Sequence, residues 1–118
     1  MQLKMDHPNG EVLRVNLEGR VVHGELNSES EPLQNLLGPV IYSRQVLLNM
    51  DAVTYIDSLG VGWLLKCHKR FREGGGKLII HSVPPLAMQV LRVLQLERVL
   101  NLAESETLAA AQLAGATP

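Results

Sequence analysis

Apolar and polar residues alternate along two short segments near the start of the chain, residues 2–6 and residues 13–18. Such alternation predicts β-strands that bury one face and expose the other. Asn9-Gly10 lies between the two segments, and this dipeptide accepts the positive φ angles of a tight hairpin turn. The pattern therefore predicts an antiparallel β-hairpin at the start of the fold.

Farther along the chain, apolar residues recur at three- and four-residue steps in some segments and form short continuous runs in others. The first pattern is typical of helices packed on a core, and the second is typical of strands buried on both faces. Capping residues, glycines and prolines mark the ends of these segments. We expect helices over residues 28–37, 58–73, 84–94 and 105–113, and strands over residues 45–50, 77–81 and 98–102.

Strands that alternate with helices pair in parallel, because each connecting helix returns the chain to the same end of the sheet. The expected fold class is therefore α/β: a mixed, mostly parallel β-sheet with an N-terminal antiparallel hairpin and about four helices packed on it. Apolar residues make up 46% of the 118 residues, which is enough for one core. No linker divides the chain, so we expect one domain over residues 1–118 with a core of about residues 3–113.

Composition narrows the range of partners. The net charge is −1, so no long-range field attracts nucleic acid or anionic lipid. Aromatic residues make up only 3% of the chain, too few to build the stacking platform of a single-strand binder. We therefore expect no nucleic-acid partner.

The apolar segments and the single cysteine indicate where the protein works. Cys67 has no second cysteine to pair with, which favours a reducing compartment. No apolar run approaches the roughly 18 residues of a membrane-spanning helix, and the first residues lack the apolar stretch of a signal peptide. We expect a cytoplasmic protein that does not insert into a membrane.

The stretch YIDSLGVGWLLK, residues 55–66, places an acid and a hydroxyl between a strand-like run and a predicted helix. A nucleophilic serine needs a base within hydrogen-bond reach, but His68 lies ten residues along the same helix, about 15 Å from Ser58 at 1.5 Å per residue. The Gly-x-Ser-x-Gly elbow of hydrolases is also missing, because Ile56 replaces its first glycine. We therefore expect no catalytic residue here.

Glycines and histidines have structural explanations. The segments 60–62 and 74–76 complete neither a dinucleotide fingerprint nor a Walker loop. We expect Gly60 to allow close approach to a neighbouring backbone, and the triple glycine to stop a helix. The histidines are scattered, and Cys67 and His68 are adjacent rather than one helical turn apart. No metal ligand set and no cofactor are expected.

Two roles stay open for the Asp57-Ser58 pair. Either residue is a good helix N-cap, since its side-chain oxygen can accept an N–H of the first turn. A serine at that place is also a suitable phosphorylation site. The unpaired N–H groups and the dipole of a helix N-terminus accept an added anion without disrupting the fold.

In this order of elements, the motif from Tyr55 to Gly62 resembles the STAS domain, in particular the small bacterial anti-sigma factor antagonists. The helix after the motif, the segment from Gly74 to Ile80 and the Pro84-Pro85 pair belong to the same pattern. The similarity runs from about Leu3 to Leu113 and is most specific from Val46 to Leu102.

The resemblance implies a binding protein rather than an enzyme. By position, Ser58 would be the phosphoacceptor, and the partner-binding residues would be Asp57, Ser58, Leu59, Gly60 and Val61. The implied partners are an anti-sigma factor that is a serine kinase with a histidine-kinase-like ATPase fold, and a serine phosphatase. The unmodified protein would capture the kinase and so regulate sigma-factor-dependent transcription.

This chain departs from the family pattern in two places. Leu59 replaces a second small hydroxyl residue, so the surface beside Ser58 is more apolar. Residues 19–26 do not match the polar, acid-bearing loop that adjoins the phosphoacceptor in the family. The alternative function is a STAS scaffold or regulatory subunit of a stress-signalling or lipid-transport assembly without a phosphorylation switch.

Overall fold

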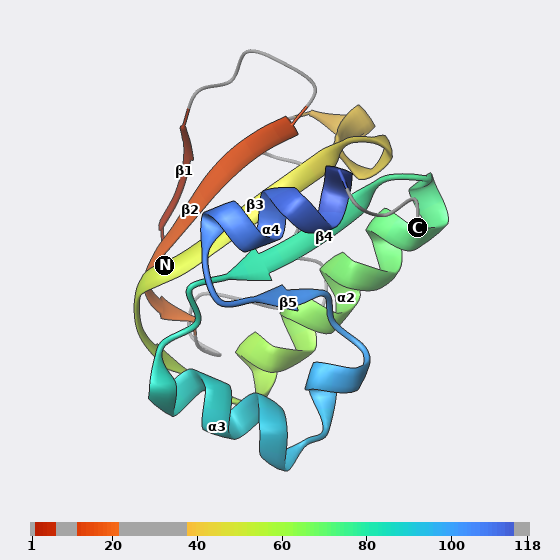
Figure 1. The fold of residues 1–118 in the computed structure, drawn as a ribbon. Coiled ribbons are helices and arrows are strands. Elements are labelled where there is room, and N and C mark those ends of the chain that lie inside the picture. The colour runs from red at the N-terminus through yellow and green to blue at the C-terminus, as the bar shows by residue number, and fades with distance from the viewer. Residues whose placement is uncertain (1, 7–11, 22–37, 115–118) are drawn as a thin grey trace.

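Residues 2–6, 12–21 and 38–114 are described by the structure, which is a computed structural model. One five-stranded sheet runs through them in the order β1-β2-β3-β4-β5 (Figure 1). The strands are β1 (Gln2–Asp6), β2 (Val12–Val21), β3 (Gln45–Ile56), β4 (Lys77–His81) and β5 (Leu102–Ala103). β1 pairs with β2 antiparallel, and every other neighbouring pair is parallel. The predicted sheet is thereby confirmed, although the hairpin turn lies outside the described residues.

Helices cover both faces of the sheet. The described residues form three α-helices and two short 3₁₀ helices. These are η2 (Pro39–Ser43), α2 (Ser58–Gly74), α3 (Pro85–Val93), η3 (Leu96–Arg98) and α4 (Glu106–Ala114). About four helices were expected, and the one predicted over residues 28–37 lies outside the described residues. In the described part of the chain, no helix has both the length and the apolar content to span a bilayer.

The core has two unequal layers on either side of β3. Val46, Leu47 and Leu48 in β3 are all fully buried, as the continuous apolar run predicted. Leu48 belongs to the larger layer, which packs against α2 and α3, and Leu47 belongs to the smaller layer under α4. Figure 1 shows α4 on one side of the sheet and α2 on the other. The middle of β3 is therefore closed to solvent on both faces.

The strand predicted over residues 98–102 is wrong for most of its length. η3 ends at Arg98, residues 99–101 form a turn outside the sheet, and only Leu102–Ala103 joins the sheet, beside β4. The N–H groups of Val99 and Leu100 donate to the Leu96 carbonyl, at 3.0 and 2.8 Å. Leu96 and Leu100, four residues apart, are both buried. Arg98, halfway between them, is exposed, whereas a strand would place it on the same buried face, so the burial pattern fits a tight turn.

Glycines bring α2 close to neighbouring backbone, as predicted for Gly60. A Cβ on Gly60 would overlap the carbonyl oxygen of Val21. At the other end of the helix, Gly75 has φ 84° and the N–H of Gly76 donates to the Phe71 carbonyl at 3.0 Å. This is the left-handed helix stop that the triple glycine predicted.

Replacement of Gly60 by alanine should destabilise the protein by about 1–3 kcal/mol, because the added methyl must displace backbone. Gly62 is the matched control. It lies in the same helix with no atom within 4 Å of its Cβ position, so Gly62→Ala should be neutral or stabilising by up to about 1 kcal/mol. Urea unfolding measures both free energies. Equal stability of the two variants would contradict the close approach.

Buried histidine should make stability depend on pH. His81 is only 2% exposed, and its Nδ1 lies 2.8 Å from the Ser82 hydroxyl. Burial lowers the pKa of His81 below its ordinary value of 6.5, and Glu106 opposes this shift only in part. The pKa of His68 is also lowered, mainly by burial and to a smaller extent by the positive charge of Arg72.

A folded-state pKa below the unfolded value means that the unfolded chain binds the proton more readily. The contribution of these neutral histidines to the unfolding free energy should therefore be fully present above about pH 6.5. It should decrease as the pH drops below that value. His81→Asn, which keeps a polar atom near the Ser82 hydroxyl, should flatten this fall in a series of urea titrations from pH 7.5 to pH 5. An unchanged slope in this variant would show that His81 does not cause the dependence.

Candidate functional site

The junction between β3 and α2 is attached to the end of β2. Ile56, the last residue of β3, pairs with Val21, the last residue of β2. The N–H of Asp57 then donates to the Val21 carbonyl at 3.2 Å. The first turn of α2 therefore has a fixed position relative to the sheet.

Asp57, rather than Ser58, caps α2. The backbone of Asp57 is extended, and its side-chain oxygen accepts the N–H of Gly60 at 2.9 Å. The Asp57 carbonyl accepts the N–H of Val61, also at 2.9 Å, which starts the helical hydrogen bonds. Ser58 is thus the first residue of the helix, and its hydroxyl is not the cap.

The structure divides the predicted site residues into an exposed pair and a buried pair. Ser58 is exposed and Leu59 is 50% exposed, whereas Gly60 and Val61 are buried in the packing of helix on sheet. Asp57 lies between these extremes, half-buried beneath the first turn. A partner at this junction could therefore contact the side chains of Ser58 and Leu59 and the exposed part of Asp57.

The N-terminus of α2 can accept negative charge. The N–H groups of Ser58 and Leu59 precede the first helical hydrogen bond, and helix geometry directs such groups outward along the axis. An anion carried by the Ser58 side chain would lie beside them. This end of the helix therefore has the donor groups that suit an anion.

Besides His68, the described residues include one histidine, His81. His81 is buried at the end of β4 and contacts the Ser82 hydroxyl. His7 and His23 lie outside the described residues. In residues 2–6, 12–21 and 38–114, no three His, Cys, Asp or Glu side chains gather where they could hold a metal ion.

An apolar groove that the sequence did not predict lies beside the junction. We call it the α3 groove. It has a volume of about 990 Å³ and lies between the end of β3 and α3. The lining residues are Val53, Thr54, Tyr55, Ile56, Pro84, Pro85, Leu86, Ala87, Gln89, Val90, Arg92, Val93 and Leu94. The signal was present in the helix predicted over residues 84–94, which has apolar residues on more than one face.

Loss of the cap is testable by substitution. Asp57→Ala should lower the unfolding free energy by about 1 kcal/mol, because the N–H of Gly60 loses its acceptor. Asp57→Asn should retain most of the stability, since an amide oxygen also caps. Ser58→Ala, with the cap intact, is the control and should change stability little. A larger loss from Ser58→Ala than from Asp57→Ala in urea unfolding would reverse the assignment.

Known proteins share this fold and sequence pattern. The anti-sigma F factor antagonist of Paenibacillus polymyxa is 26% identical over 116 residues, which cover 96% of this chain and 95% of that protein. The structure of the anti-sigma factor antagonist SpoIIAA in its unphosphorylated form superposes with a TM-score of 0.69 at 19% identity, covering 97% of each chain.

A third similar protein is an anti-sigma-factor antagonist (STAS) domain protein from Planctomyces limnophilus. Its structure has a TM-score of 0.64 at 20% identity and covers 98% of each chain. The structural likenesses establish the fold, and the family is established by sequence. The sequence model of the STAS domain matches residues 2–109, and we conclude that this chain belongs to the STAS domain family.

Proposed function

We propose that this protein is an anti-sigma factor antagonist whose binding is switched by phosphorylation of Ser58. The unmodified form binds an anti-sigma factor that is a serine kinase, and so releases a sigma factor for transcription. The kinase phosphorylates Ser58 and the complex dissociates, and a serine phosphatase restores the unmodified form. The protein itself acts by binding, without turnover, in the cytoplasm where such partners work.

The observation that supports this proposal best is the exposed position of Ser58 as the first residue of α2. A kinase must reach the hydroxyl, and the folded protein must tolerate the phosphate. The fixed junction supports the second condition, because the cap belongs to Asp57 and the buried packing belongs to Gly60 and Val61. The free end of the helix supplies N–H groups for the added charge.

Phosphorylation also changes what a partner meets at this surface. The phosphate adds about −1.5 to −2 charges next to the Asp57 carboxylate and the half-exposed Leu59. The surface around Ser58, which combines a hydroxyl with the apolar side chain of Leu59, becomes strongly anionic. A partner that is complementary to the unmodified surface would have to strip water from the phosphate without offering an opposite charge. Its binding should therefore be weaker.

The proposal identifies the residue that a cognate kinase should label. Candidate kinases are the histidine-kinase-like ATPases of the organism that encodes this chain, each purified and incubated with the protein and labelled ATP. One of them should label the parent and the Ser43→Ala control, in which another exposed serine is removed, but not Ser58→Ala. Labelling of Ser58→Ala at the parent rate would refute Ser58 as the phosphoacceptor.

Capture should depend on the charge at the same position. Ser58→Ala should bind the kinase like the parent, whereas Ser58→Glu should bind at least about tenfold more weakly, because a carboxylate is introduced into the interface. Circular dichroism should show both variants folded. Isothermal titration calorimetry measures the affinities, and parental affinity in Ser58→Glu would contradict the switch. Parent, Ser58→Ala and Ser58→Glu that form the same stable hetero-oligomer would favour the scaffold function instead.

A further inference from the structure

The outer side of α3 is unusually apolar for a helix that faces solvent. Ala87 and Leu91 are buried and attach α3 to the core. A second stripe, at positions i, i+4, i+7 and i+8, lies along the α3 groove and consists of Leu86, Val90, Val93 and Leu94, of which Val90 also packs partly against the core. In this stripe Leu86 is 76% exposed and Val93 is 81% exposed. A helix with two apolar stripes is typical of one that is covered on both sides.

The opposite wall of the α3 groove is the open edge of β3. β4 pairs with β3 only as far as Asn49 and His81, and β3 continues to Ile56. After His81 the chain leaves the sheet, and Pro84-Pro85 leads it into α3 (Figure 1). In the described structure, the last residues of β3 therefore have no partner strand on the side of β4. On the opposite side they remain paired with β2.

The list of lining residues shows that the groove meets this edge. Neighbouring side chains of a strand point to opposite faces of its sheet. A groove lined by one face would therefore meet every second residue, but the α3 groove meets all of Val53, Thr54, Tyr55 and Ile56. The groove meets four consecutive residues, although the side chains of Val53 and Ile56 are buried, which indicates contact with the backbone along the edge of the strand. In the described structure no strand pairs with the N–H and C=O groups on that edge.

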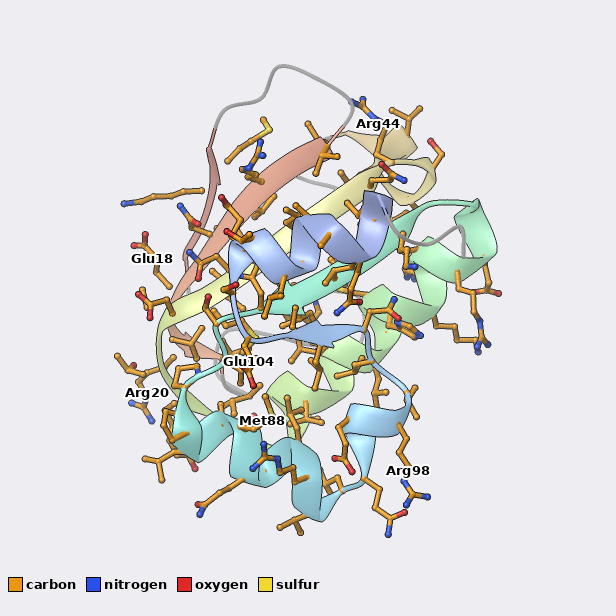
Figure 2. The ribbon with its side chains drawn as sticks, viewed as in Figure 1. Glu18, Arg20, Arg44, Met88, Arg98 and Glu104 are labelled. Carbon is orange, nitrogen blue, oxygen red and sulfur yellow. The ribbon has the colours of Figure 1, made fainter. Side chains whose placement is uncertain are left out.

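The one charged residue among the described residues that line the α3 groove is basic. Arg92 lines it, and the guanidinium of Arg20 lies 5.6 Å from the centre of the Tyr55 ring. None of the described lining residues is acidic. Figure 2 labels Arg20 on the side of the molecule where α3 begins. An apolar groove with Arg92 in its lining, and with Arg20 held against the ring of Tyr55, is complementary to an apolar segment flanked by Asp or Glu.

We propose that the α3 groove accepts an extended apolar segment, flanked by acidic residues, from the anti-sigma factor kinase, and that this segment pairs with the open edge of β3. The inference rests on the proposed function, because it names where the same partner binds. Ile56, which lines the groove, ends β3 two residues before Ser58, so the groove lies next in sequence to the proposed phosphorylation site. Addition of a strand to a free sheet edge gives affinity through backbone hydrogen bonds, and the apolar stripe of α3 gives specificity.

Substitution on the exposed stripe separates this site from Ser58. Val93→Glu places a carboxylate in the groove and should weaken kinase binding at least about tenfold, because that charge loses water on binding. Leu108→Glu is the matched control: Leu108 is 50% exposed, and its helix α4 covers the other face of the sheet. Leu108→Glu should bind like the parent.

Steady-state phosphorylation gives a second measurement. Val93→Glu should raise KM for labelling of Ser58 about tenfold and leave kcat unchanged, since the groove holds the partner but does not touch the reacting hydroxyl. Arg92→Glu should also raise KM, and less so at high salt, where charge is screened. Arg98→Glu, an equivalent change on exposed η3 outside the groove, should have no effect.

Hydrogen exchange tests the strand pairing itself. With the kinase bound, amides within residues 53–56 should exchange more slowly than in the free protein. If Val93→Glu weakens binding but these amides stay unprotected, the segment does not pair with β3 and the proposal is wrong. If the parent binds and Val93→Glu binds equally well, the groove is wrong while the proposed function stands. If the unmodified parent binds no candidate kinase, both fail.

Discussion

The carbonyl oxygen of Val21, at the end of β2, meets α2 at two points. It accepts the N–H of Asp57, and it lies where a side chain on Gly60 would have to be. Backbone contacts therefore fix the first turn of α2 against the sheet. Because Asp57 caps this turn from beneath and Val61 packs inward, the exposed position of Ser58 follows from the backbone. The proposed modification would therefore be made on the surface, outside the buried core.

β3 links the core to the proposed binding surface. Its first half is buried under helices on both faces, whereas its second half extends beyond the end of β4, where no strand of the described residues pairs with it on that side. Proline has no backbone N–H to donate to a neighbouring strand, so the Pro84-Pro85 pair ends the sheet pairing and leads the chain into α3. These prolines and α3 form the other wall of the groove. The same strand thus supports the fold, positions Ser58 and borders the α3 groove.

Local patterns predicted most of this fold because the deciding interactions are local. Alternation defined the hairpin strands, the continuous run at 45–50 defined the buried strand, and the triple glycine ended α2 where expected. The extension of β3 to Ile56 and the shortening of β5 depend on where neighbouring strands stop, which no local pattern encodes. Likewise, either Asp57 or Ser58 satisfied the capping rule, and only the Gly60 contact distinguishes them. The α3 groove required tertiary structure, because its two walls are about 30 residues apart in sequence.

The central claim is that a phosphate on Ser58 changes binding without changing the fold. The most direct measurement compares the kinase affinity of the unmodified protein with that of the protein carrying phosphoserine at position 58, by isothermal titration calorimetry, with thermal unfolding as the check on folding. The account predicts at least about tenfold weaker binding of the phosphorylated protein, with a Tm within a few degrees of the unmodified form. Equal affinities, or a phosphorylated protein that no longer folds, would contradict it.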